Sequence, residues 1–183
     1  MTSVKTAIVA TMAMVGVGGQ VGEPTSQRGE APAEFLERLE GRWSVVTEAT
    51  LGPGQTPVRT ESRVAARLLA GKWLVAEGRG TAPGGQTVIS ILTLGHDPAE
   101  ERFVGTWISS MQTHLWRYTG MLNPSGTALT LETRGPILGD PATTANYREI
   151  IEIESADHHV IRSMILGPDG KWFEFARAEY RRL

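Results

Sequence analysis

At 183 residues, with 40% hydrophobic and 21% charged side chains, the chain has the size and composition of a single globular domain. Its formal net charge of −2 gives no basic excess for binding phosphates, which argues against nucleic acid as a partner. Cysteine is absent, and this excludes disulfides, thiolate metal sites and a cysteine nucleophile.

The first 22 residues differ from the rest of the chain. Lys5 is the only charged residue among them, and residues 6–19 form an uncharged, mainly apolar run that ends in small residues. This pattern predicts a signal peptide over residues 1–22, because the run is too short to span a bilayer. We therefore expect an exported protein, periplasmic or secreted, whose mature form has no membrane span. The alternative is that this run forms a buried N-terminal strand or helix.

Residues 23–31 are rich in Glu, Pro, Ser and Gly, and this composition predicts a flexible spacer. A short helix is predicted over residues 32–40, since Pro32 suits a first turn and Phe35, Leu36 and Leu39 share one face. The barrel domain is accordingly predicted over residues 32–183.

From Arg42 onward the apolar pattern has a period of two, and turn residues recur at short intervals. The segment 135–145 is predicted to be a long loop. About ten strands are predicted, starting near Trp43 and continuing over residues 58–69, 73–80, 87–94, 102–111, 115–122, 128–133, 147–154, 160–166 and 172–181.

Short connections force neighbouring strands to pair antiparallel, because a parallel crossover needs a dozen or more residues. Ten strands in one meander leave two open edges unless the sheet closes. The predicted fold class is therefore all-β, a single antiparallel meander barrel of about eight to ten strands with a short N-terminal helix. A two-sheet sandwich is the alternative.

The segment Gly41-Arg42-Trp43, placed after a helix and at the start of the first strand, resembles the Gly-x-Trp opening of lipocalins and other calycins. That resemblance implies that Trp43 closes the barrel floor and that an arginine of the last strand packs over it. Arg181 is taken as this partner, with Arg182 as the alternative.

A longer set of segments looks like a bacterial calycin-type family, the domain of unknown function DUF1579. The family usually has Tyr in place of His96 and Asp in place of Ser109. The resemblance spans residues 35–183 and implies the fold but no activity. It is carried by Gly95-His96-Asp97-Pro98, Arg102-Phe103, the run Gly105-Thr106-Trp107-Ile108-Ser109-Ser110-Met111, Tyr147-Arg148 and Gly170-Lys171-Trp172-Phe173-Glu174.

Candidate ligand-binding residues lie in the aromatic-rich middle of the chain. Trp107, Ser109 and Met111 share one face by strand alternation and could line a pocket or form plain core. His114 lies between two aromatic-rich strands. Facing inward, it would suit ligand binding, haem ligation or acid–base chemistry. The alternative for His114 is a rim position or a satisfied core histidine.

Charged residues within the strands add one more candidate. Glu77, Arg148 and Arg162 stand among apolar neighbours, so an internal Arg–Glu pair facing an acidic ligand is conceivable, with Arg148 as the ligand-binding member. The alternative is that all three face solvent. His158 and His159 sit in a predicted hairpin turn and point to opposite faces, so no metal site is expected there.

We therefore expect an exported β-barrel that binds a small apolar or amphipathic molecule in its interior, without a cofactor or metal. Two alternatives stay open. One is an enzyme, an isomerase or hydrolase that uses a pocket histidine and could depend on haem. The other is a packed structural or partner-binding barrel whose function lies on the segment 135–145.

Overall fold

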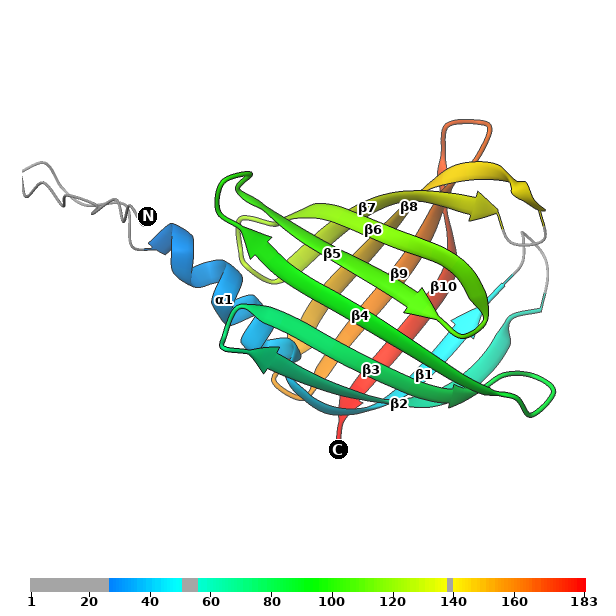
Figure 1. The fold of residues 1–183 in the computed structure, drawn as a ribbon, viewed down its shortest axis with the longest axis horizontal. Helices are drawn as coiled ribbons and strands as arrows, with labels where there is room; N and C mark the ends of the chain where they lie inside the picture. Colours follow the sequence, from blue (N-terminus) through cyan, green and yellow to red (C-terminus); the bar gives the residue numbers. More distant parts are fainter. Residues whose placement is uncertain (1–26, 51–55, 138–139) are drawn as a thin grey trace, which may run out of the picture.

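The computed structural model describes residues 27–50, 56–137 and 140–183. The predicted signal peptide, residues 1–22, lies outside the described residues, as does the first part of the predicted spacer. Figure 1 shows one helix, α1, at one end of a barrel of strands. In the described part of the chain, no helix has the length and apolar character needed to cross a bilayer.

The strands form one closed barrel in which each strand pairs antiparallel with its neighbours in the chain, and β1 pairs with β10 to close the ring. The predicted antiparallel meander barrel is confirmed. After α1 (Gln27–Leu39), its strands are β1 (Gly41–Ala49), β2 (Val58–Leu69), β3 (Trp73–Thr81), β4 (Thr87–Asp97), β5 (Arg102–Ser109), β6 (Gln112–Leu122), β7 (Ala128–Ile137), β8 (Asp140–Ser155), β9 (His158–Leu166) and β10 (Trp172–Arg182).

Two predicted boundaries differ from the structure. The helix begins at Gln27 rather than at Pro32, so a turn of helix precedes the proline. Because Pro32 has no backbone N–H, one hydrogen bond of the helix is missing at this position. The predicted long loop 135–145 is mostly strand, because β7 runs to Ile137 and β8 begins at Asp140. Gly135 and Pro136 suggested a loop, but both lie in the β7–β8 ladder.

Helix α1 closes one end of the barrel. Phe35, Leu36 and Leu39, its predicted apolar face, are buried and belong to the main hydrophobic core. The ring of Phe35 meets that of Phe103 edge to face, with ring centres 5.9 Å apart. Because a helix this short is unstable alone, its docking on the barrel is what holds it in place.

The floor beneath α1 is built around Trp43. Its indole is 1% exposed, and its Nε1–H donates to the Leu39 carbonyl at 3.0 Å. The Arg182 guanidinium lies over the indole, 4.2 Å from the ring centre. Arg182 also donates to the carbonyls of Arg38, Glu40 and Ala156 and pairs with Asp157.

The arginine over the floor is thus Arg182 and not Arg181. Trp43 faces inward and pairs across the ladder with Arg182, so alternation turns Arg181 to the outside, where it is exposed. Gly41 lets the guanidinium approach the chain closely. It has a φ of 133°, and any Cβ there would overlap the Arg182 side chain.

We expect Arg182→Ala to lower the free energy of unfolding by about 2 kcal/mol, since it removes a cation–π contact and several charge-assisted hydrogen bonds. Arg181→Ala is the matched control and should change that free energy by less than about 0.5 kcal/mol. Urea unfolding followed by circular dichroism measures both. Equal losses in the two variants would contradict this account of the floor.

Candidate functional site

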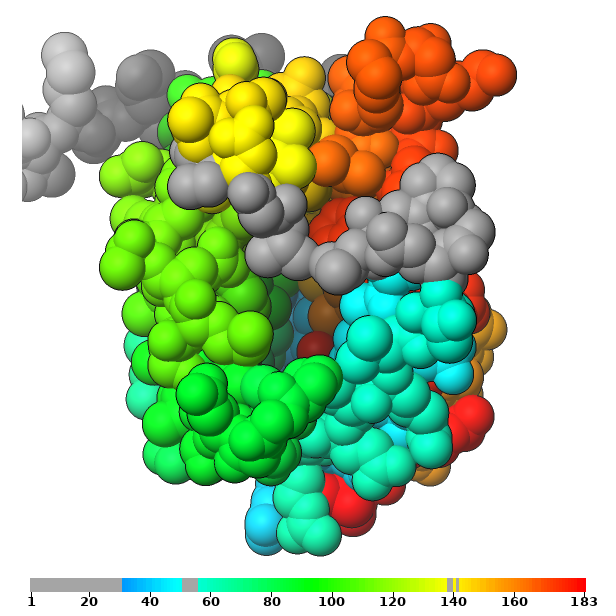
Figure 2. Space-filling model, turned by 90° about the vertical axis from the view of Figure 1, so that its right-hand side faces the viewer, coloured from blue at the N-terminus to red at the C-terminus, as the bar shows by residue number. Residues whose placement is uncertain are grey.

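The interior of the barrel is incompletely filled. Inward-facing side chains of the middle and open end keep accessible surface, although a filled and closed barrel would bury them. They include Leu92, Trp107, Ile161, Ile165 and Ala178. A barrel of about eight strands is just wide enough for side chains to fill, so ten strands leave additional room. Figure 2 looks at the end opposite α1 and shows a hollow near its centre.

An acidic side chain faces this space. Glu149 of β8 shares strand parity with the buried Tyr147, Ile151 and Ile153, and therefore points inward. Its Oε2 accepts a hydrogen bond of 2.6 Å from the Ser163 hydroxyl on neighbouring β9. The barrel thus carries a carboxyl group on its inner wall, above the apolar floor.

Burial inside the barrel raises the pKa of the Glu149 carboxyl to about 7, and the hydrogen bond from Ser163 offsets part of the rise. The side chain nevertheless keeps some accessible surface. The raised pKa and the remaining accessible surface of Glu149 are compatible if the space beside the side chain is an internal cavity rather than open solvent.

Two tyrosines belong to the same region. Burial, and secondarily the negative charge of Glu149, raises the pKa of Tyr180 to about 12 and also raises that of Tyr118. Tyr180 comes from β10 and Tyr118 from β6, so polar groups from several sides of the barrel approach Glu149. With the Ser163 hydroxyl they form a polar region within an otherwise apolar interior.

A histidine lies between this region and the floor. His159 stacks on the Tyr180 ring at 4.3 Å and meets the Trp43 ring edge to face at 4.4 Å. Burial, then the neighbouring His158 and Arg182, lowers its pKa to about 3, so the imidazole is neutral. His158 faces outward and pairs with Glu179 at 2.6 Å. The two histidines therefore do point to opposite faces, as predicted.

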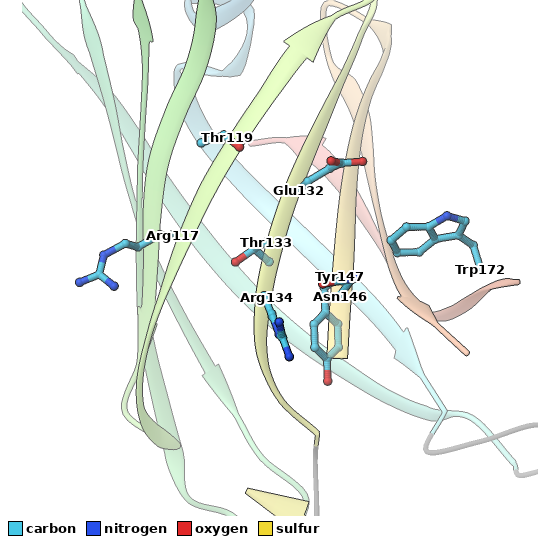
Figure 3. Close-up of a pocket in the computed structure, with 8 residues that line it drawn as sticks. All are labelled: Arg117, Thr119, Glu132, Thr133, Arg134, Asn146, Tyr147 and Trp172. Carbon is cyan, nitrogen blue, oxygen red and sulfur yellow. The ribbon is translucent and has the colours of Figure 1, made fainter. Parts of the chain in front are cut away.

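The barrel wall is weakest between β6 and β7. Register pairs join only Thr119–Leu122 to Leu129–Glu132, and the rest of β6 runs past β7 without a register pair. A groove of about 490 Å³ follows this seam. Its lining combines outward-facing and inward-facing residues, shown in Figure 3: Arg117, Thr119, Glu132, Thr133, Arg134, Asn146, Tyr147 and Trp172. The Arg117 and Arg134 guanidinium groups lie apart rather than converging (Figure 3), so the groove assembles no paired-arginine anion site.

Three buried polar atoms lie along the inner side of this seam without a hydrogen-bond partner among the described residues. They are Nε2 of His114, Nε1 of Trp116 and Oγ1 of Thr133. The ring of His114 meets that of Trp116 edge to face at 4.9 Å, and both pack against Gly135, where a Cβ would overlap the indole. Because an unsatisfied buried polar group costs about 1–3 kcal/mol, these atoms are suited to a bound polar group.

The predicted ligand-binding residues are only partly brought together. Trp107 faces the interior beside Trp116, its ladder partner on β6. Ser109 is buried, and its hydroxyl accepts a hydrogen bond from the Met111 amide at 3.2 Å. Met111 is 68% exposed and does not line the interior. Because β5 ends at Ser109, Met111 lies in the turn, and strand alternation no longer sets its direction.

Arg148 lies on the outside of the barrel. It pairs with Glu132 at 2.6 Å and its guanidinium stacks on the Trp172 ring at 4.1 Å. Glu77 pairs with Arg79, and Arg162 pairs with Glu174, likewise on the outer face. The internal Arg–Glu pair considered from the sequence is therefore absent among these residues. All three side chains face solvent, which was the alternative.

Sequence reasoning missed Glu149, Ser163, Tyr118 and Tyr180, the polar groups of the interior. A signal for Glu149 was present, since Tyr147, Glu149, Ile151 and Ile153 occupy alternate positions of one strand. The sequence-based prediction instead named Arg148 as the ligand-binding residue of this strand. No group of three or more metal-ligating side chains comes together in the described residues.

The model of the family described as "Protein of unknown function (DUF1579)" matches residues 29–182. No curated protein matches the chain. Among solved structures, Rv2717c from M. tuberculosis is similar with a TM-score of 0.57 and 14% identity, over 83% of this chain and 98% of that one. This likeness concerns the fold alone. A redesigned β-barrel, mFAP0 bound to DFHBI, has a TM-score of 0.43 and 14% identity, over 79% of this chain and 99% of its own.

Proposed function

The chain belongs to the DUF1579 family, whose description carries no activity, and from the interior itself we propose that this protein binds a small amphipathic molecule inside the barrel. The observation that carries the proposal is the accessible surface retained by inward-facing side chains in a closed barrel. A concave, mainly apolar space with a few convergent polar groups is the usual form of a small-molecule site.

The two ends of the barrel differ, and the difference supports ligand entry from one end only. Helix α1 and the Trp43–Arg182 floor block one end, whereas the opposite end is hollowed (Figure 2). A ligand would then enter from the open end. Its apolar part would lie against Trp107, Ile161 and Ile165, and its polar part would reach the region of Glu149. The signal peptide predicted from the sequence over residues 1–22 supports export as the setting proposed for this function.

The proposal is tested by blocking the interior. Ala178 faces inward, next to Thr47 and Ile161 in the ladders, so Ala178→Phe places a ring in the free space. We expect this variant to bind Nile red, a neutral apolar dye, at least about tenfold more weakly than the unaltered protein, by fluorescence titration.

The matched control is Ala65→Phe, which adds the same ring to an exposed position on the outside of β2. It should leave the dissociation constant unchanged, and circular dichroism verifies that both variants fold. Equal affinity in the unaltered protein and Ala178→Phe would place the dye elsewhere and contradict interior binding.

A further inference from the structure

Glu149 is an acidic side chain in the barrel interior, where ionisation of a carboxyl group is energetically unfavourable. It lies on the inner wall between Leu131 of β7 and Ser163 of β9, which are its ladder partners. A carboxylate removed from water must be paired or fully hydrogen-bonded to be tolerated. Another group must therefore compensate the charge of the ionised Glu149 carboxylate.

The described residues supply only part of that compensation. The Ser163 hydroxyl donates one hydrogen bond to Glu149. No ion pair of residues 27–50, 56–137 and 140–183 includes Glu149. The nearby arginines of β8 and β9, Arg148 and Arg162, face outward and are paired with other carboxylates.

The other titratable groups of this region are neutral. Tyr118 of β6 and Tyr180 of β10 stay protonated because burial raises the pKa of each phenol. His159 of β9, stacked on Tyr180, stays neutral because burial lowers the pKa of its imidazole. Among the described residues, the one charged group on the inner side besides Glu149 is Arg182 of the floor, which is bound to backbone carbonyls and Asp157 and acts on His159. Arg182 is not among the causes of the raised pKa of Glu149, whose other titratable neighbours named above are neutral.

We propose that Glu149 anchors the head of the ligand, and that this head is a protonated amine on an apolar body. An ammonium group supplies both the missing positive charge and the hydrogen-bond donors that the free lone pairs of a carboxylate can accept. This inference rests on the proposed interior binding.

The test uses three probes with the same tail: octylammonium, octanol and octanoate, each displacing Nile red at pH 8. We expect octylammonium to bind at least about tenfold more tightly than octanol, and octanoate to bind most weakly. Glu149→Gln should weaken octylammonium binding at least about tenfold and change octanol binding less than about threefold. Glu154→Gln, at an exposed position of the same strand, is the matched control and should alter neither.

A second readout is independent of affinity. A bound cation favours the charged carboxylate and lowers the pKa of Glu149, so octylammonium binding near pH 7 should release protons. Calorimetric titration in buffers of different ionisation enthalpy measures this release, which should disappear in Glu149→Gln. If octanol displaces Nile red and octylammonium binds no better, or octanoate binds best, the assignment of the head group is overturned while interior binding stands. If neither Nile red nor octanol binds, interior binding fails, and this inference fails with it.

Discussion

Trp43→Ala should lower the free energy of unfolding by about 4 kcal/mol, the largest effect expected of a single substitution in this protein. The indole is fully buried between the Arg182 guanidinium and the His159 ring, and it donates a hydrogen bond to Leu39 at the end of α1. Alanine would leave a cavity, an unstacked arginine and an unsatisfied helix carbonyl at one place. Urea unfolding followed by far-ultraviolet circular dichroism measures the loss.

Trp73→Ala is the matched control. Trp73 is the first residue of β3 and its indole is 43% exposed, so its removal should cost less than about 1 kcal/mol. Because Trp43 joins α1 to the barrel, Trp43→Ala should also speed tryptic cleavage after the exposed Arg38, and Trp73→Ala should not. Similar losses of stability in the two variants would show that the floor does not depend on Trp43.

The strands were predictable because their determinants are local. Alternation of apolar and polar residues and closely spaced turns identify β2, for example, with the bounds that the structure gives. Closure followed from general rules on unpaired edges and short connections. The β7–β8 hairpin was missed because Gly135 and Pro136, which usually end strands, are tolerated where β6 does not pair with β7.

The site was less predictable than the fold. Alternation tells which residues share a face but not which face is inside, and that choice placed Arg182 inward and Arg181 outward. On β8 it placed Glu149 inward and Arg148 outward, so the charged residue chosen from the sequence was the neighbour of the one that faces the interior. Whether the interior is filled depends on the width of the whole barrel, a property that no single strand contains.

Glu149 and His159 should impose opposite pH dependences on stability. The folded state holds the Glu149 proton more tightly than the unfolded state does, since its pKa is raised from 4.5 to about 7. Stability from this group is therefore present at low pH and is lost as the pH rises from about 4.5 to 7. His159, with its pKa lowered from 6.5 to about 3, makes the protein less stable as the pH falls through that range.

The two effects predict the shape of the stability curve. Between about pH 4.5 and 6.5 they oppose each other and give a plateau, with a fall below it due to His159 and a fall above it due to Glu149. Glu149→Gln keeps a polar group of the same size at the Ser163 hydroxyl but does not ionise. As the pH rises from 4.5 to 8, the free energy of unfolding of the variant should increase by about 3 kcal/mol relative to that of the unaltered protein.

Urea unfolding at intervals of half a pH unit measures this difference, and the acid side should be the same in both proteins because His159 is unchanged. Glu154→Gln, on the same strand but exposed to solvent, should give a curve parallel to that of the unaltered protein. If the Glu149→Gln curve were also parallel, the carboxyl would have to be ionised at its ordinary pKa and in contact with solvent. A group so hydrated would not need a cation from a ligand, so this measurement bears on both the closed interior and the chemistry proposed for what it binds.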